Sequence, residues 1–143
     1  MSLMVTFQSK TGNDNWKIYL NEVSEGKNHL FGPEDCRKTL WGNPILGKFR
    51  LRILPTIREC DVIVFDEELY NLKEEFEIIL SNINEIAYIT NWPADFIEFR
   101  VQNAIEYIEI ALKHKEDIGI YRVKFYMEIR TDHYRDSKLP DVV

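Results

Sequence analysis

The sequence predicts an α+β domain with a mainly antiparallel sheet of about five strands and two long helices, about 67–87 and 95–115, packed on one face. Segments near both ends alternate apolar and polar residues with the period of two that is typical of strands. The middle third repeats its apolar residues with the helical period. Strands grouped apart from the helices favour an antiparallel sheet. The length of 143 residues predicts a single domain, 1–143.

Three alternating segments predict strands. Residues 3–8 and 16–21 alternate, and the turn-forming residues 11–15 between them predict a β-hairpin. Residues 121–130 alternate most regularly, so we expect this last strand to pair centrally in the sheet. The polar segment 131–143 that follows is expected to be a loose C-terminal tail.

The part of the chain before the helices is less regular. Residues 48–54 alternate and predict a strand, and the apolar run 62–65 predicts a strand covered on both faces. Residues 22–47 are rich in glycine and proline and predict a loop, with a short helix from Pro33 to about Leu40. Long loops of this kind are often functional.

The two predicted helices differ in their surfaces. The helix at 67–87 has one apolar arc of about 100° and an opposite acidic face, in which Ile78 is embedded. The helix at 95–115 carries a first apolar stripe and, roughly 140° away, a second one. A helix that is apolar on this much of its circumference is expected to be buried on two sides. The second stripe contains Phe96, Phe99, Tyr107 and Ile110.

Charge is distributed unevenly along the chain. Residues 1–58 carry nine Lys/Arg and five Asp/Glu, a net charge of +4. Residues 59–117 carry four and fifteen, a net charge of −11, and residues 118–143 carry five and four, a net charge of +1. The acidic middle would attract a basic protein and repel a phosphate backbone, so nucleic acid is an unlikely partner.

Composition indicates a cytoplasmic protein that does not enter a membrane. The chain lacks an apolar run of the roughly 20 residues that a membrane span needs, and its first residues do not resemble a signal peptide. Two cysteines, Cys36 and Cys60, are too few for a disulfide framework and fit a reducing compartment.

The sequence contains no pattern that indicates catalysis or metal binding. The three histidines, at positions 29, 114 and 133, are not spaced as metal ligands on one helix or strand. No serine lies in a nucleophile-elbow motif, and no glycine-rich loop has the spacing of a phosphate-binding loop. We therefore predict no catalytic residue, metal or cofactor, which favours a protein that is not an enzyme over one that is.

These observations favour a non-catalytic protein-binding domain that uses an acidic helical surface. The chain is similar to antidote or immunity-type proteins, which cover a basic toxin, only in its size, acidity and α+β composition. A second copy of the chain, joined through the second apolar stripe, is the other partner to consider. The residues expected to form the interface are Tyr70, Glu74, Glu75, Ile78, Glu85, Phe99, Tyr107 and Ile110.

Two alternatives remain open. The first is a small-molecule enzyme or ligand-binding domain with a pocket between sheet and helices, lined by Trp41, Tyr107 and Tyr121. The second is RNA binding through the basic face of 48–54. That face could equally contact the acidic helices of the same molecule.

Overall fold

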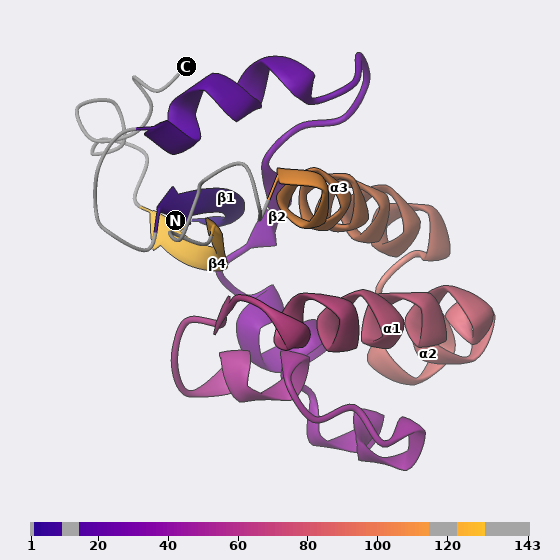
Figure 1. Ribbon diagram of the computed structural model, residues 1–143. Coiled ribbons are helices and arrows are strands. Elements are labelled where there is room, and N and C mark those ends of the chain that lie inside the picture. The colour runs from indigo at the N-terminus through magenta and orange to yellow at the C-terminus, as the bar shows by residue number, and fades with distance from the viewer. Residues whose placement is uncertain (1, 10–14, 115–122, 131–143) are drawn as a thin grey trace.

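Helices make up most of the part of the chain that the structure describes. The computed structural model describes residues 2–9, 15–114 and 123–130 (Figure 1). In chain order its elements are β1 (Ser2–Ser9), η1 (Asn15–Glu22), β2 (Leu30–Pro33), η2 (Arg37–Trp41), η3 (Pro44–Phe49), η4 (Leu54–Arg58), β3 (Ile63–Val64), α1 (Glu67–Ser81), α2 (Ile83–Thr90), α3 (Ala94–His114) and β4 (Val123–Arg130). The predicted tail, 131–143, lies outside these residues.

The sheet is smaller than predicted. Among the described residues it has four antiparallel strands in the order β2-β1-β4-β3. Only β1 and β4 pair at length, from Ser2 with Arg130 to Ser9 with Val123, whereas β2 and β3 each pair at two positions. The prediction of a five-stranded sheet with two long helices is therefore wrong. The central position of the last strand is as expected.

The predicted hairpin is also wrong, because residues 16–21 belong to the short helix η1 instead of a strand. Trp16, Tyr19, Leu20 and Val23 pack against the core, and their spacing is helical. Ile18, which the alternating pattern places inside, is 61% exposed. The same six residues fit both periods, and packing selects the helical one.

Residues 48–54 form no strand either. Arg50 has a φ of 63°, a left-handed conformation that interrupts an extended segment. Pro55 lies in the first turn of η4, where its fixed φ suits a helix. Leu51 and Ile53 are nevertheless buried, as the alternation predicts. Residues 62–65 form only the short edge strand β3, and Ile63 is 52% exposed instead of covered.

The predicted helix 67–87 is two helices, α1 and α2. Asn82, at the junction, has φ −121° and ψ 25°, and its side chain donates a hydrogen bond to the Ile78 carbonyl (2.8 Å). An asparagine that bonds backbone in this way competes with the helical pattern. The bounds of α3 lie within one residue of those predicted.

The core joins the sheet to the helices. Phe31 of β2 stacks on Trp41 with ring centroids 4.2 Å apart and meets Phe76 of α1 edge-on at 5.9 Å. The indole N–H of Trp41 donates to the Phe31 carbonyl (3.0 Å), so this buried polar group is satisfied. In Figure 1, α3 lies between η1 and α1, next to the sheet. Of its second apolar stripe, Tyr107 and Ile110 are buried, whereas Phe96 is half-buried and Phe99 is exposed.

Asn91, which ends α2, offers a test of the backbone. Its φ of 63° and ψ of 29° are left-handed, a conformation that asparagine and glycine tolerate and alanine does not. We expect Asn91→Ala to lower the free energy of unfolding by about 1 kcal/mol and Asn91→Gly to change it by less than about 0.5 kcal/mol. Urea denaturation of the two variants and the parent measures this. Equal losses in both variants would show that backbone conformation is not what the asparagine provides.

Candidate functional site

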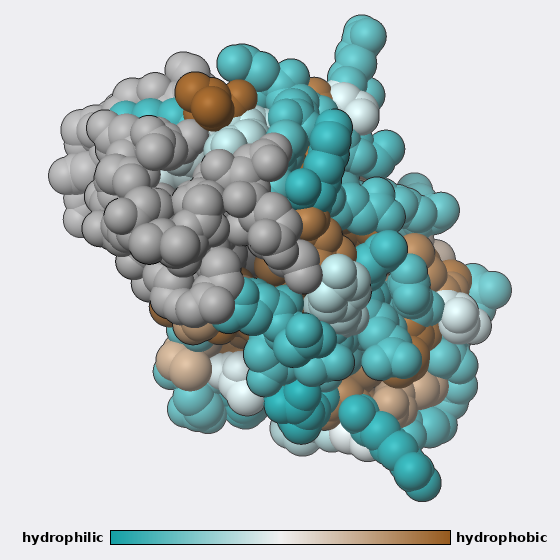
Figure 2. All heavy atoms as spheres, in the orientation of Figure 1, coloured by the Kyte–Doolittle hydropathy of each residue, from teal (hydrophilic) through white to brown (hydrophobic). Residues whose placement is uncertain are grey.

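One face of α1 exposes three carboxylates around a tyrosine. Glu67, Tyr70, Glu74 and Glu77 are all exposed, and Tyr70 retains 48% of its accessible surface. At 3.6 residues per turn they fall within an arc of about 80°. We call these four residues the acidic face. On the side of the molecule where α1 lies, Figure 2 shows hydrophilic residues with small hydrophobic areas between them.

The carboxylates of the acidic face have no ion-pair partner in the ranges that the structure describes, unlike several of their neighbours. Arg52 Nη2 lies 3.2 Å from Glu68 Oε1, and Lys48 pairs with Glu85 on α2. The basic residues of 48–54 thus contact acidic helices of the same molecule, one of the roles considered for them. Among these basic residues, Arg50 is exposed and has no such contact among the described residues.

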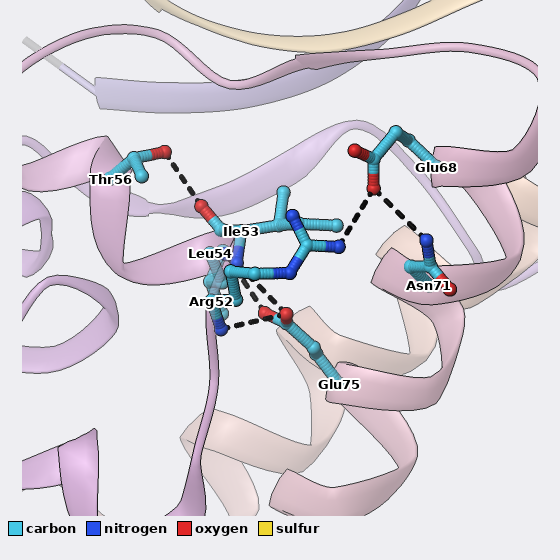
Figure 3. A network of polar contacts seen from close by, with 7 residues as sticks. All are labelled: Arg52, Ile53, Leu54, Thr56, Glu68, Asn71 and Glu75. Atoms are coloured by element: carbon cyan, nitrogen blue, oxygen red, sulfur yellow. Dashed lines mark hydrogen bonds and ion pairs between the residues drawn. The ribbon is translucent and has the colours of Figure 1, made fainter.

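Glu75 is adjacent to the acidic face in sequence but lies inside the protein. It is 7% exposed, and its carboxylate accepts hydrogen bonds from three consecutive backbone N–H groups, those of Arg52 and Ile53 (both 2.8 Å) and Leu54 (2.9 Å). Figure 3 shows the carboxylate pointing from α1 at this turn. Because these N–H groups precede and begin η4, Glu75 caps that helix and is unavailable to a partner.

Three other residues expected at an interface are only partly free. Ile78 is half-buried and packs against the core. Glu85 is exposed but is paired with Lys48. Phe99 is 37% exposed and, with Lys27, Asp95, Glu98 and Gln102, lines a shallow hollow of about 290 Å³ on the surface of α3.

Tyr107 and Ile110 are core residues of a single chain, with 4% and 7% exposure. The Tyr107 ring lies 4.9 Å from that of Phe7, centroid to centroid, and burial raises the pKa of its hydroxyl to about 12. Two members of the second apolar stripe therefore cannot contact a second copy in this conformation. Trp41 of the alternative pocket is also fully buried, and Tyr121 lies outside the described residues.

The sequence pattern could have identified two residues of the acidic face that were not predicted, Glu67 and Glu77. Both fall in the arc of Tyr70 and Glu74 when α1 is drawn at 100° per residue. Nothing in the local sequence indicates that Glu75 is buried, because the backbone groups that bind it are more than twenty positions away.

The described residues contain no group of three or more His, Cys, Asp or Glu side chains placed to hold a metal ion. Cys36 is fully buried, and this burial raises the pKa of its thiol to about 12, so the reactive thiolate is strongly disfavoured. Cys60 is exposed, and its thiol lies 3.6 Å from the Thr56 carbonyl.

None of the described helices combines the length and the apolar character needed to cross a membrane. No protein-family model, curated protein or solved structure matches the chain.

Glu75 and Glu74 form a matched pair for testing the buried cap. Glu75→Gln replaces a charged acceptor with an amide, one half of which cannot accept from the turn, so we expect it to lower the free energy of unfolding by about 2–3 kcal/mol. Glu74→Gln removes the same charge from the exposed face and should change stability by less than about 0.5 kcal/mol. Urea denaturation distinguishes them. Similar losses for both variants would contradict the role of Glu75 as a cap.

Proposed function

We propose that this chain is a non-catalytic protein-binding domain whose acidic face contacts a basic protein, in the manner of an antidote or immunity-type protein. The observation that carries the proposal is the contrast on α1. The acidic face keeps three carboxylates without ion-pair partners in the described ranges, while Glu68 and Glu75 beside them are engaged within the chain.

Charge complementarity supports a basic partner. Residues 59–117 carry a net charge of −11, and two cations near α1 and α2, Lys48 and Arg52, are already used in internal pairs. Along α1, Glu67 and Glu74 lie about 10 Å apart at 1.5 Å per residue. A partner whose Lys or Arg side chains repeat at this interval would meet both carboxylates, and the long-range field would speed the encounter.

Tyr70 supplies the apolar contact that such an interface needs. Tyrosine is enriched among the residues that dominate binding energy, and a rim of charged groups around an aromatic centre is the usual organisation of an interface. With Glu67 and Glu74 on one side and Glu77 further along the same face, Tyr70 stands among the acids as the anchor. Of the residues predicted for an interface, Glu74 is the other one on the acidic face.

A ligand pocket and a homodimer both lose residues on which they depended. A ligand pocket lined by Trp41 and Tyr107 would require side chains that are packed in the core. A twofold dimer through Tyr107 and Ile110 meets the same difficulty. We therefore favour a partner with a different, basic sequence over a small molecule or a second copy.

Selection from a displayed peptide library of varied net charge tests the proposal with a defined probe. We expect peptides rich in Lys and Arg to be enriched on the parent chain. The variant Glu67→Gln/Glu74→Gln/Glu77→Gln should bind the selected peptides at least about tenfold more weakly, because it loses three charges from one face. Binding should also weaken as salt is raised.

A matched triple variant separates the acidic face from total charge. Glu25→Gln/Glu59→Gln/Glu98→Gln removes the same number of exposed charges elsewhere, and its affinity for the selected peptides should stay within about twofold of the parent. The proposal fails if no basic peptides are enriched, or if both triple variants lose affinity equally. Urea denaturation of each triple variant confirms that the fold is retained.

A further inference from the structure

A line of polar side chains on α3 holds the segment that runs from η1 to β2. Asn103 is fully buried: its side chain accepts from the Asn28 backbone N–H (3.0 Å) and donates to the Asn28 side chain (3.1 Å) and the Leu30 carbonyl (3.0 Å). One turn further, Glu106 Oε2 accepts from the Ser24 backbone N–H (2.9 Å) and hydroxyl (2.7 Å). Hydrogen bonds from Asn103 and Glu106 thus hold the segment against α3 at Ser24, Asn28 and Leu30.

At the C-terminus of α3, a cluster of charged side chains makes a further contact with η1. His114 Nε2 lies 2.6 Å from one carboxylate oxygen of Glu22, and Lys113 Nζ lies 3.3 Å from the other. The His114 ring also packs on that of Tyr19, with centroids 4.4 Å apart. Both basic residues suit the negative end of the helix dipole.

The apolar side chains of this segment pack against the core but are only partly buried. Trp16, Tyr19, Leu20 and Val23 are only half-buried. At its end toward β2 the segment passes through Gly26, whose φ of 91° and open surroundings provide a natural hinge. Segments whose apolar side chains are only partly buried open locally at lower cost than the core, so we expect the polar contacts to influence how often this one opens.

We propose that residues 15–24 form a pH-sensitive strap, which stays docked on α3 while His114 is protonated and opens more often when His114 is neutral. The direction follows from linkage. Docking places the imidazole against the Glu22 carboxylate, which favours the charged ring, so this part of the docking energy is present at low pH and is lost as the pH rises through the histidine range.

The groups around the His114 imidazole are consistent with pH-dependent docking of the strap. Among the described residues, the charged or titratable groups facing it are Glu22 and Tyr19 from η1 and Lys113 from α3 itself. The pKa of Glu22 is lowered, chiefly by its hydrogen bond with His114, so the carboxylate remains charged throughout the histidine range. Lys113 keeps its contact with Glu22 when His114 is neutral, so the strap is loosened and not detached.

Hydrogen exchange of the strap amides, measured by mass spectrometry on the full chain at about pH 6 and about pH 8 and corrected for intrinsic rates, tests the proposal. We expect protection of 15–24 to be about fivefold greater at the lower pH, the size expected for a half-buried histidine cation at a helix C-terminus. His114→Gln should show the lower protection at both pH values, and Glu22→Gln should lose the pH difference as well.

Three controls make the outcome specific. His29→Gln should keep the pH difference, since His29 is exposed and makes no contact with Glu22 among the described residues. Glu109→Gln, which removes a carboxylate paired with Lys73 elsewhere on α3, should also keep it. The amides of β1 report on global unfolding. The proposal is overturned if the parent strap is equally protected at both pH values, or if the difference persists in His114→Gln.

Discussion

The carboxylate of Glu75 is the contact on which the arrangement of the irregular part of the chain depends. Residues 34–62 contain only short helices, and a short helix leaves most of its terminal N–H groups without partners. Glu75 satisfies three of them at the start of η4 from the middle of α1. This fixes the 52–54 turn against α1, and with it the contact between Arg52 and Glu68. The side of α1 left open is the acidic face.

The acidic residues of the middle segment thus do three different things. Glu75 satisfies backbone groups, Glu68 and Glu85 neutralise cations of the preceding segment, and the acidic face remains in water. On the other side of the molecule, Glu106 fastens the strap. A net charge summed over the segment describes none of these roles, because each depends on which part of the chain lies next to the carboxylate. The negative charge left available to a partner is smaller than the net charge of −11 suggests, but it is concentrated on one face of α1.

Elements with one strong period could be predicted from the sequence, and ambiguous ones could not. β4 and α3 were predicted within a few residues, because their apolar patterns run for ten or more positions, whereas β1 was predicted correctly from an alternation of only six residues. Residues 16–21 satisfy both periods, and the helical solution wins because Trp16 and Tyr19 reach the core that way. The break at Asn82 depends on one local hydrogen bond. At the site, Tyr70 and Glu74 are exposed as predicted, while the burial of Glu75 depends on a distant turn that periodicity does not see.

The pairing of β1 with β4 has a consequence for the order in which the protein is made. Val123, the first residue of β4, is 114 positions after Ser9, the last residue of β1. At 5–20 residues per second, a ribosome needs roughly 6 to 23 s to cover that distance. During this time β2 is the only native pairing partner of β1 in the described ranges that has been made, and it pairs at just two positions. The edge of β1 that pairs with β4 has no native partner until the last strand is made, which makes the nascent chain the stage most open to wrong pairing.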